Sequence, residues 1–206
     1  MQSVTHSFIV SVVDSYAIAA RQIRWLARIL PDNWELIFVD DGSDPPIAIP
    51  EERPANFRLL LTGEVRKPGE WTQHLAINKA VALARGGYIL KSDIDHVFTR
   101  EAIAAADRLT GDMMLFHRRA GVLTEDFRIE TIDHPVNSPV DDIYVMRKSL
   151  FLSLGGYPET VTRQYGGAGK FLWEYSRRPD AAPTEDALIF VTPDSHETYH
   201  NLTRAQ

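Results

Sequence analysis

Two aspartates separated by one residue, Asp93 and Asp95, follow a short apolar run at residues 88–91 (YILK). Such a run favours a buried strand, so both carboxylates are expected just past its carboxyl end. Hard divalent cations prefer oxygen ligands, and this pair could hold one ion. The adjacent His96 could be a third ligand, although an exposed loop position is the interpretation that we favour. An Asp-x-Asp triplet alone is common, so its surroundings decide its meaning.

Two more acidic groups follow predicted strands. Asp14 comes after residues 8–13 (FIVSVV), and the pair Asp40-Asp41 comes after residues 36–39. Ligands of open α/β sheets bind beyond the carboxyl ends of the strands, so the three groups should meet at one edge. Each has a structural alternative, because aspartate is common in turns and helix caps. Together their charges would repel one another, and a cation would relieve that repulsion.

The elements that would position these residues alternate along the chain. Apolar spacing predicts a helix over 17–30 and another over 72–85, with Gly86-Gly87 as the C-terminal cap of the second. The other predicted elements are strands at 57–61 and 112–117 and a helix at 100–109. This order predicts a single α/β domain over 1–206, a Rossmann-like fold whose mixed, mainly parallel sheet is flanked by helices.

Composition excludes several classes of protein. The 206 residues include 22 Lys+Arg, 28 Asp+Glu and no Cys, which gives a net charge of −6 and excludes thiolate metal sites. An acidic chain is poorly suited to bind nucleic acid unless it has a concentrated basic patch. The densest basic clusters here are only the pairs Arg118-Arg119 and Arg177-Arg178. No apolar run reaches the roughly 18 residues of a transmembrane helix. We therefore expect a cytoplasmic protein without a transmembrane segment.

Four blocks of sequence, in order, resemble a family 2 glycosyltransferase of the GT-A fold. They are FIVSVV with the following Tyr16, ELIFVDDGSD (35–44), HLAINKAVALARGGYILKSDID (74–95) and LGGYPE (154–159). The resemblance covers about residues 7–178. It implies a metal-dependent, hexosyltransferase-type enzyme that moves a sugar from a nucleotide-sugar donor, most often a UDP-sugar, to a hydroxyl acceptor. A glycan or a lipid-linked molecule would be such an acceptor, and a lipid-linked one would place the protein peripherally at a membrane.

The resemblance also implies roles for single residues. Tyr16 would pack on the nucleotide base, Asp41 would contact uracil, and Asp40 would shape the loop. Asp93 and Asp95 would bind Mn²⁺ or Mg²⁺ on the donor diphosphate, so Asp95 also counts as catalytic. The implied donor-binding set is Asp14, Tyr16, Asp40, Asp41, Asn78 and Asp93.

The C-terminal segment, residues 179–206, is expected to close over the donor. Its Pro-rich part, 179–193, predicts a loop. His196 and His200 lie four residues apart, which on a helix places both imidazoles on one face. The resemblance implies that a histidine from such a segment is a metal ligand. The alternative is an ordinary polar tail.

The acceptor side departs from the family pattern. Ala168-Gly169 stand in the stretch 165–170 where an inverting enzyme would have a Glu-Asp pair, the aspartate acting as general base. Glu174 is the substitute base that we name, and the other candidates are Glu159, Asp141 and Asp142. An enzyme with a displaced base, a retaining enzyme and a non-catalytic nucleotide-sugar-binding module all stay open. So does a different α/β enzyme, although the sequence lacks the Gly-rich, Arg-containing loop of a nucleotidyltransferase.

Overall fold

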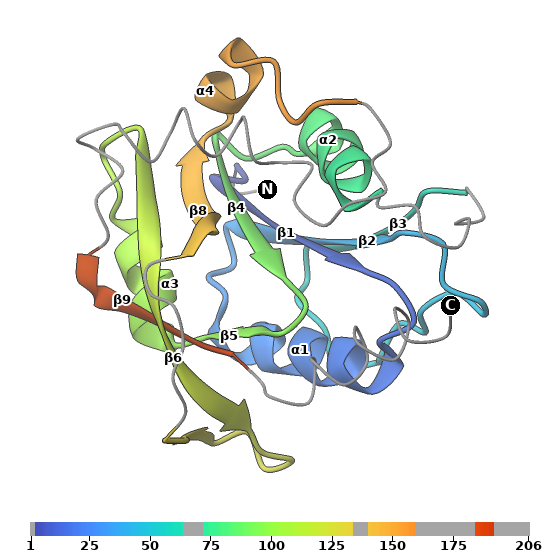
Figure 1. Ribbon diagram of the computed structural model, residues 1–206, viewed down its shortest axis with the longest axis vertical. Helices are drawn as coiled ribbons and strands as arrows, with labels where there is room; N and C mark the ends of the chain where they lie inside the picture. The colour runs from blue at the N-terminus through green and yellow to red at the C-terminus, as the bar shows by residue number, and fades with distance from the viewer. Residues whose placement is uncertain (1–2, 64–71, 134–139, 160–183, 192–206) are drawn as a thin grey trace.

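The computed structural model describes residues 3–63, 72–133, 140–159 and 184–191 (Figure 1). The strands of the described chain are β1 (His6–Val12), β2 (Trp34–Asp40), β3 (Phe57–Leu61), β4 (Tyr88–Asp93), β5 (His96–Phe98), β6 (Met113–Leu123), β7 (Ile129–Thr131), β8 (Val140–Arg147) and β9 (Thr184–Val191). Its helices are α1 (Tyr16–Ile29), α2 (Gln73–Leu83), α3 (Arg100–Asp107) and α4 (Lys148–Ser153).

The strands form one mixed sheet in the order β3-β2-β1-β4-β8-β6-β9-β5, with β7 paired to β6 beside this path. The first four strands of that order are parallel to one another, whereas β8 is antiparallel to both β4 and β6. The predicted α/β fold with a sheet flanked by helices is therefore confirmed. The parallel part is the half that carries the acidic strand ends.

Successive residues of the central strands point to opposite faces of the sheet and pack into two separate hydrophobic cores, one on each face. Phe8 and Val10 belong to the core that α1 and α3 cover, and Ile9 belongs to the core that α2 and α4 cover. Figure 1 shows α2 and α4 on one side of the sheet and α1 on the other. Every residue of β1 and β2 is buried, as expected for parallel strands covered on both faces.

The predicted cap of α2 is wrong. The helix ends at Leu83, and Ala84 is already extended, so Gly86-Gly87 do not cap it. A Cβ on Gly86 would lie 2.6 Å from backbone atoms of His6 and Ser7. Glycine is needed at position 86 because the chain entering β4 passes directly against β1.

The second half of the chain is more regular than its prolines suggest. Residues 184–191, inside the predicted loop 179–193, form β9, which pairs in parallel with β6 and antiparallel with β5. The loop prediction is therefore wrong for these residues. The rest of the predicted closing segment, 179–206, lies outside the described residues, and its closure over the donor stays a prediction.

Candidate functional site

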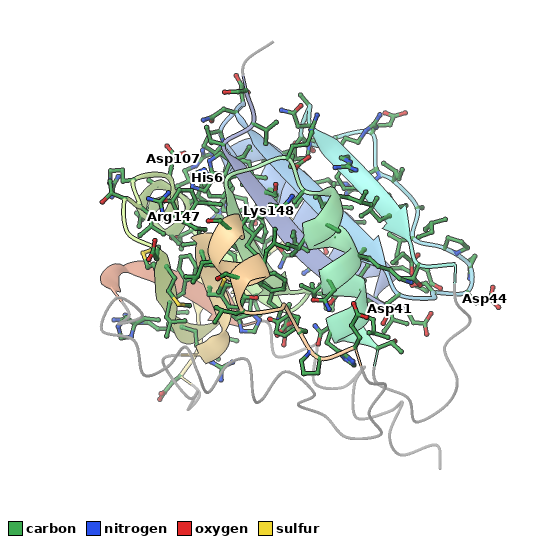
Figure 2. The ribbon with its side chains drawn as sticks, turned by 90° about the horizontal axis from the view of Figure 1, so that it is seen from above. His6, Asp41, Asp44, Asp107, Arg147 and Lys148 are labelled. Carbon is green, nitrogen blue, oxygen red and sulfur yellow. The ribbon has the colours of Figure 1, made fainter. Side chains whose placement is uncertain are left out.

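The strand register brings the acidic groups to one edge of the sheet. β1 lies between β2 and β4, with Val12 opposite Asp40 and Ser11 opposite Asp93. In Figure 2, Asp41 and Asp44 lie at the carboxyl end of these strands, and His6 lies at the opposite end. Adjacent parallel strands that end together place the side chains that follow them around one space.

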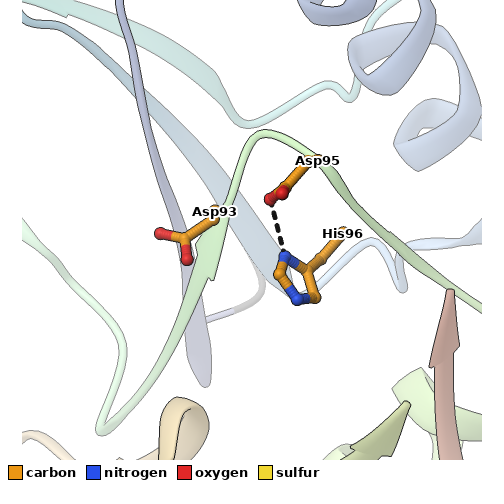
Figure 3. Close-up of side chains that lie close together, drawn as sticks. All are labelled: Asp93, Asp95 and His96. Atoms are coloured by element: carbon orange, nitrogen blue, oxygen red, sulfur yellow. Dashed lines mark hydrogen bonds and ion pairs between the residues drawn. The ribbon is translucent and has the colours of Figure 1, made fainter. Parts of the chain in front are cut away.

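Asp93, Asp95 and His96 converge at the end of β4 (Figure 3). One ligand atom from each lies within 4.8 Å of the other two, and the two aspartates are partly exposed. Opposite ligands of one Mg²⁺ or Ca²⁺ ion are about 4–5 Å apart, so the spacing fits a single divalent ion. Carboxylates suit Mg²⁺, Ca²⁺ and Mn²⁺, and imidazole is a ligand of transition metals.

His96 is not the exposed loop residue that we expected. It is 4% exposed, and it begins β5 with its backbone opposite Val191 of β9. Its Nδ1 lies 2.8 Å from Asp95 Oδ1, and Arg118 Nη1 lies 3.4 Å from its Nε2. A guanidinium can only donate, so this contact assigns Nε2 as the acceptor and Nδ1–H as the donor to Asp95. The prediction failed because His96 belongs to β5, which pairs with a strand 95 positions further along the chain.

Asp93 has two donors on the same oxygen. Lys91 Nζ lies 2.7 Å from Asp93 Oδ1, and Gln73 Nε2 donates to that atom at 2.7 Å. Lys91 is 3% exposed, so its ammonium is a buried positive charge within the acidic edge. The repulsion expected between the carboxylates is thus partly offset by the chain itself.

The start of α2 connects the two acidic loops. Thr72 donates to Asp41 Oδ2 at 2.6 Å, and the next residue, Gln73, donates to Asp93. Side chains at the N-terminus of α2 therefore contact a carboxylate of each loop. Asp40 is buried, and its two oxygens accept the backbone N–H groups of Ser43 and Ile47 at 2.8 Å each. Asp40 thus shapes the loop that presents Asp41.

Asp14 and Tyr16 contact the same loop from the end of β1. The Tyr16 hydroxyl donates to the Pro45 carbonyl at 2.8 Å and to Asp14 Oδ1 at 3.3 Å. Desolvation, followed by the negative charge of Asp14, raises the pKa of Tyr16, so the phenol keeps its proton. With Tyr16 38% exposed, its ring is accessible beside the 43–45 loop.

Asn78 holds a turn. Its Nδ2 donates to the Tyr157 carbonyl at 2.9 Å, and its Oδ1 accepts the Tyr157 N–H at 3.0 Å. Both ends of the amide are therefore engaged by the LGGYPE turn. Asn78 thus holds this turn, and its predicted contact with the donor stays a prediction.

Several predicted residues fall outside the described part of the chain. These are Glu174, Ala168, Gly169, His196 and His200, together with the side chains of Asp141 and Asp142. Glu159 is described and exposed. Their roles as base or metal ligand stay predictions.

Sequence reasoning missed Lys91, Thr72, Gln73 and Gln22. Lys91 is charged within an otherwise apolar run, and Gln22 is polar on the apolar face of α1, so both carried a signal. Thr72 and Gln73 carried none, because the carboxylates that they contact are about 20 to 30 positions away.

No helix in the described ranges combines the length and hydropathy needed to cross a membrane.

Residues 7–108 match the family model described as glycosyl transferase family 2. No curated protein matches the sequence. Among solved structures, residues 1–349 of S. aureus TarS match at 17% identity and a TM-score of 0.63, covering 98% of this chain and 64% of that one. The same TarS fragment in complex with UDP-GlcNAc matches at 15% identity and a TM-score of 0.67, covering 91% and 58%.

A third solved structure is the mannosyltransferase PcManGT from Pyrobaculum calidifontis in complex with GDP-Man and Mn²⁺. It matches at 15% identity and a TM-score of 0.58, covering 90% of this chain and 56% of that one. The chain thus spans 56–64% of the length of these three chains. At such identities the similarity establishes the fold, which is that of GT-A glycosyltransferases.

Proposed function

We propose that this chain is a family 2-like glycosyltransferase of the GT-A fold. From that premise, it transfers a sugar from a nucleotide-sugar donor to an acceptor hydroxyl, and the reaction requires a divalent cation. The observation that carries the proposal is the convergence of Asp93, Asp95 and His96 at the carboxyl edge of the parallel strands. Asp41 lies on the same edge and is linked to Asp93 through Thr72 and Gln73.

The cation would be held by Asp93 and Asp95, with His96 as a third ligand if its Nε2 lone pair is released from Arg118 to the ion. Bound there, it would supply positive charge to the diphosphate leaving group as the sugar–phosphate bond breaks. Without a cation, an acidic edge of this kind would repel an anionic donor. Mn²⁺ is the ion that we propose, because the donor set mixes carboxylates with imidazole and because PcManGT binds Mn²⁺ together with GDP-Man.

The nucleotide would lie along the other acidic loops. Tyr16 presents an exposed ring for stacking on the base, and Asp41 has a largely buried carboxylate that accepts a hydrogen bond from Thr72. UDP is the nucleotide that we propose, since TarS binds UDP and UDP-GlcNAc. We propose Glu174 as the general base that accepts the proton of the acceptor hydroxyl.

A non-catalytic nucleotide-sugar-binding module is the second candidate. It is favoured by Ala168-Gly169, which replace the Glu-Asp pair of inverting relatives. Such a module would bind donor and metal but would release no nucleotide diphosphate with any acceptor.

The test is a thermal-shift screen of UDP- and GDP-sugars with and without Mn²⁺. A ligand at 100 times its Kd stabilises the fold by about 2.7 kcal/mol, which for a domain of this size is about 5–10 °C in Tm. We expect this shift only when donor and metal are both present.

The Asp93→Asn/Asp95→Asn variant should lose the shift. The matched control is Glu52→Gln, an exposed carboxylate paired with Arg28 far from this edge, which should keep it. A full metal-dependent shift in the double variant would overturn the site. Binding with no turnover over a panel of glycan and lipid-linked acceptors would select the second candidate.

A further inference from the structure

The buried face of α1 carries two polar side chains among its apolar ones. Gln22 is 4% exposed and Trp25 is 8% exposed, on the face that also buries Ala19, Ile23 and Leu26. A buried amide without partners would destabilise the fold, so its hydrogen bonds matter. Those bonds go to the segment that carries the Asp-x-Asp turn.

Gln22 bonds to both sides of Asp95. Its Nε2 donates to the Ile94 carbonyl at 3.3 Å and to the His96 carbonyl at 3.0 Å. One turn further along α1, Trp25 Nε1 donates to the Phe98 carbonyl at 2.8 Å. The helix therefore contacts every second carbonyl from residue 94 to residue 98.

This pattern follows from the position of β5 in the sheet. Among the described strands, β5 is the last in the order, and it pairs with β9 on one side. In an antiparallel pair, successive residues turn their carbonyls alternately toward the partner and away from it. The His96 and Phe98 carbonyls, which are turned away, would be unsatisfied in the core, and α1 supplies their donors through side chains. The Ile94 carbonyl lies in the turn before β5 and shares the Gln22 amide.

We propose that Gln22 is a positioning residue that holds the backbone on both sides of Asp95, so that Asp95 and His96 keep the spacing that a divalent cation requires. The inference rests on the proposed function. Both amide hydrogens of Gln22 are used, one on each side of Asp95, so the carbonyls of Ile94 and His96 are restrained together. Trp25 restrains the same strand at Phe98, beyond the ligand residues.

The same helix reaches the predicted base site. α1 begins at Tyr16, whose hydroxyl contacts the Pro45 carbonyl, and Gln22 lies less than two turns further on. A rigid helix therefore sets the distance between the loop that would receive the base and the turn that would receive the metal. Gln22 fixes the metal end of that connection.

The test compares Gln22→Met with Trp25→Phe. Methionine has nearly the size of glutamine but no donor, and phenylalanine removes only the indole N–H. Mn²⁺ is titrated into each protein and followed by the electron paramagnetic resonance of the free ion, first alone and then with UDP. Removal of an outer-shell partner typically weakens metal affinity by about 10–100-fold, and we expect a loss in that range for Gln22→Met.

Trp25→Phe should keep the wild-type Mn²⁺ affinity even if its Tm falls as far as that of Gln22→Met. Hydrogen exchange without metal should be faster over residues 93–96 in Gln22→Met than in wild type. If Gln22→Met does not fold, Gln22→Asn is the variant that tests the inference. The asparagine amide is one methylene too short to reach both carbonyls, so this variant should also bind Mn²⁺ more weakly.

Wild-type Mn²⁺ affinity in the folded Gln22 variant would overturn this inference, as would an equal loss in Trp25→Phe. No Mn²⁺ binding by the wild-type protein, with or without UDP, would overturn the proposed function and this inference together. The two failures are therefore distinguishable.

Discussion

Lys91 is the residue that most changes how the acidic edge should be understood. Its side chain is 4% exposed and lies 2.7 Å from Asp93, which is 18% exposed. Breaking a fully buried ion pair by removing one partner costs about 3–5 kcal/mol, because a charge is left without compensation. Lys91 thus supplies part of the positive charge that relieves repulsion within the acidic edge.

Lys91→Met should lower the free energy of unfolding by about 2 kcal/mol, below the range for a fully buried pair because Asp93 keeps contact with water. For a domain of this size that is about 4–8 °C in Tm. Mn²⁺ with UDP should then raise the Tm of the variant by more than it raises that of the wild type, because the ion replaces the missing ammonium. Calorimetry with and without Mn²⁺ measures both effects.

The control for this prediction is Lys79→Met, an exposed lysine on α2. Its Mn²⁺-dependent shift should equal that of the wild type. An equal shift in Lys91→Met would show that the ion does not contact Asp93.

At the scale of elements, the turn into β4 depends on Gly86. The backbone of residues 84–87 connects α2 to β4, and Gly86 N–H donates to Ser7 Oγ at 2.9 Å. The short distance to the β1 backbone leaves no room for a side chain. β4 ends at Asp93, so the way in which it packs on β1 also determines where the metal ligands lie.

Gly86→Ala should destabilise the fold by about 1–3 kcal/mol, the usual cost of overpacking, because backbone atoms 2.6 Å from the new Cβ cannot rotate away. Gly87→Ala is the matched control, since its Cβ would meet only the Thr5 carbonyl at 3.9 Å. Urea unfolding of the two variants measures the difference. Equal midpoints would contradict the close approach of the two strands.

At the scale of the whole molecule, one buried carboxylate joins four segments. Glu35 on β2 is 0% exposed; it accepts Ser7 Oγ at 2.6 Å and both the backbone N–H and the Nε of Arg85, at 2.5 and 2.8 Å. Arg58 of β3 lies 3.4 Å from it. Burial alone would raise the pKa of Glu35, but the hydrogen bonds from Ser7 and Arg85 outweigh it and lower that pKa.

This lowered pKa predicts how stability depends on pH. A carboxyl whose pKa is lower in the folded state stabilises the fold above its unfolded pKa and loses that contribution as the pH falls through the folded value. Glu35→Gln should therefore cost about 1–3 kcal/mol at pH 7. The difference between wild type and variant should shrink below about pH 4, near the unfolded pKa of glutamate. Tm measured from pH 3 to pH 7 tests this, and a difference independent of pH would contradict it.

Local pattern was enough to predict the order of the elements and the three acidic strand ends. Apolar runs such as 8–13 and helical spacing such as that of 17–30 arise because one or both faces of a strand or helix are buried. The pattern therefore appears among residues that are close in the sequence. Parallel strands then require their carboxyl ends to meet. The sequence by itself therefore places Asp14, Asp41 and Asp93 at one edge of the sheet.

Tertiary structure alone decided which groups complete that edge. His96 lies in β5, which pairs with β9. Lys91 and Gln73 converge on Asp93, and Gln22 reaches the turn from α1. The contacts of His96, Gln73 and Gln22 join residues about 20 to 95 positions apart, so no local pattern encodes them. The physical reason is that hydrophobic burial is periodic along the chain, whereas the hydrogen bonds and charges that orient a site depend on which distant segments pack together.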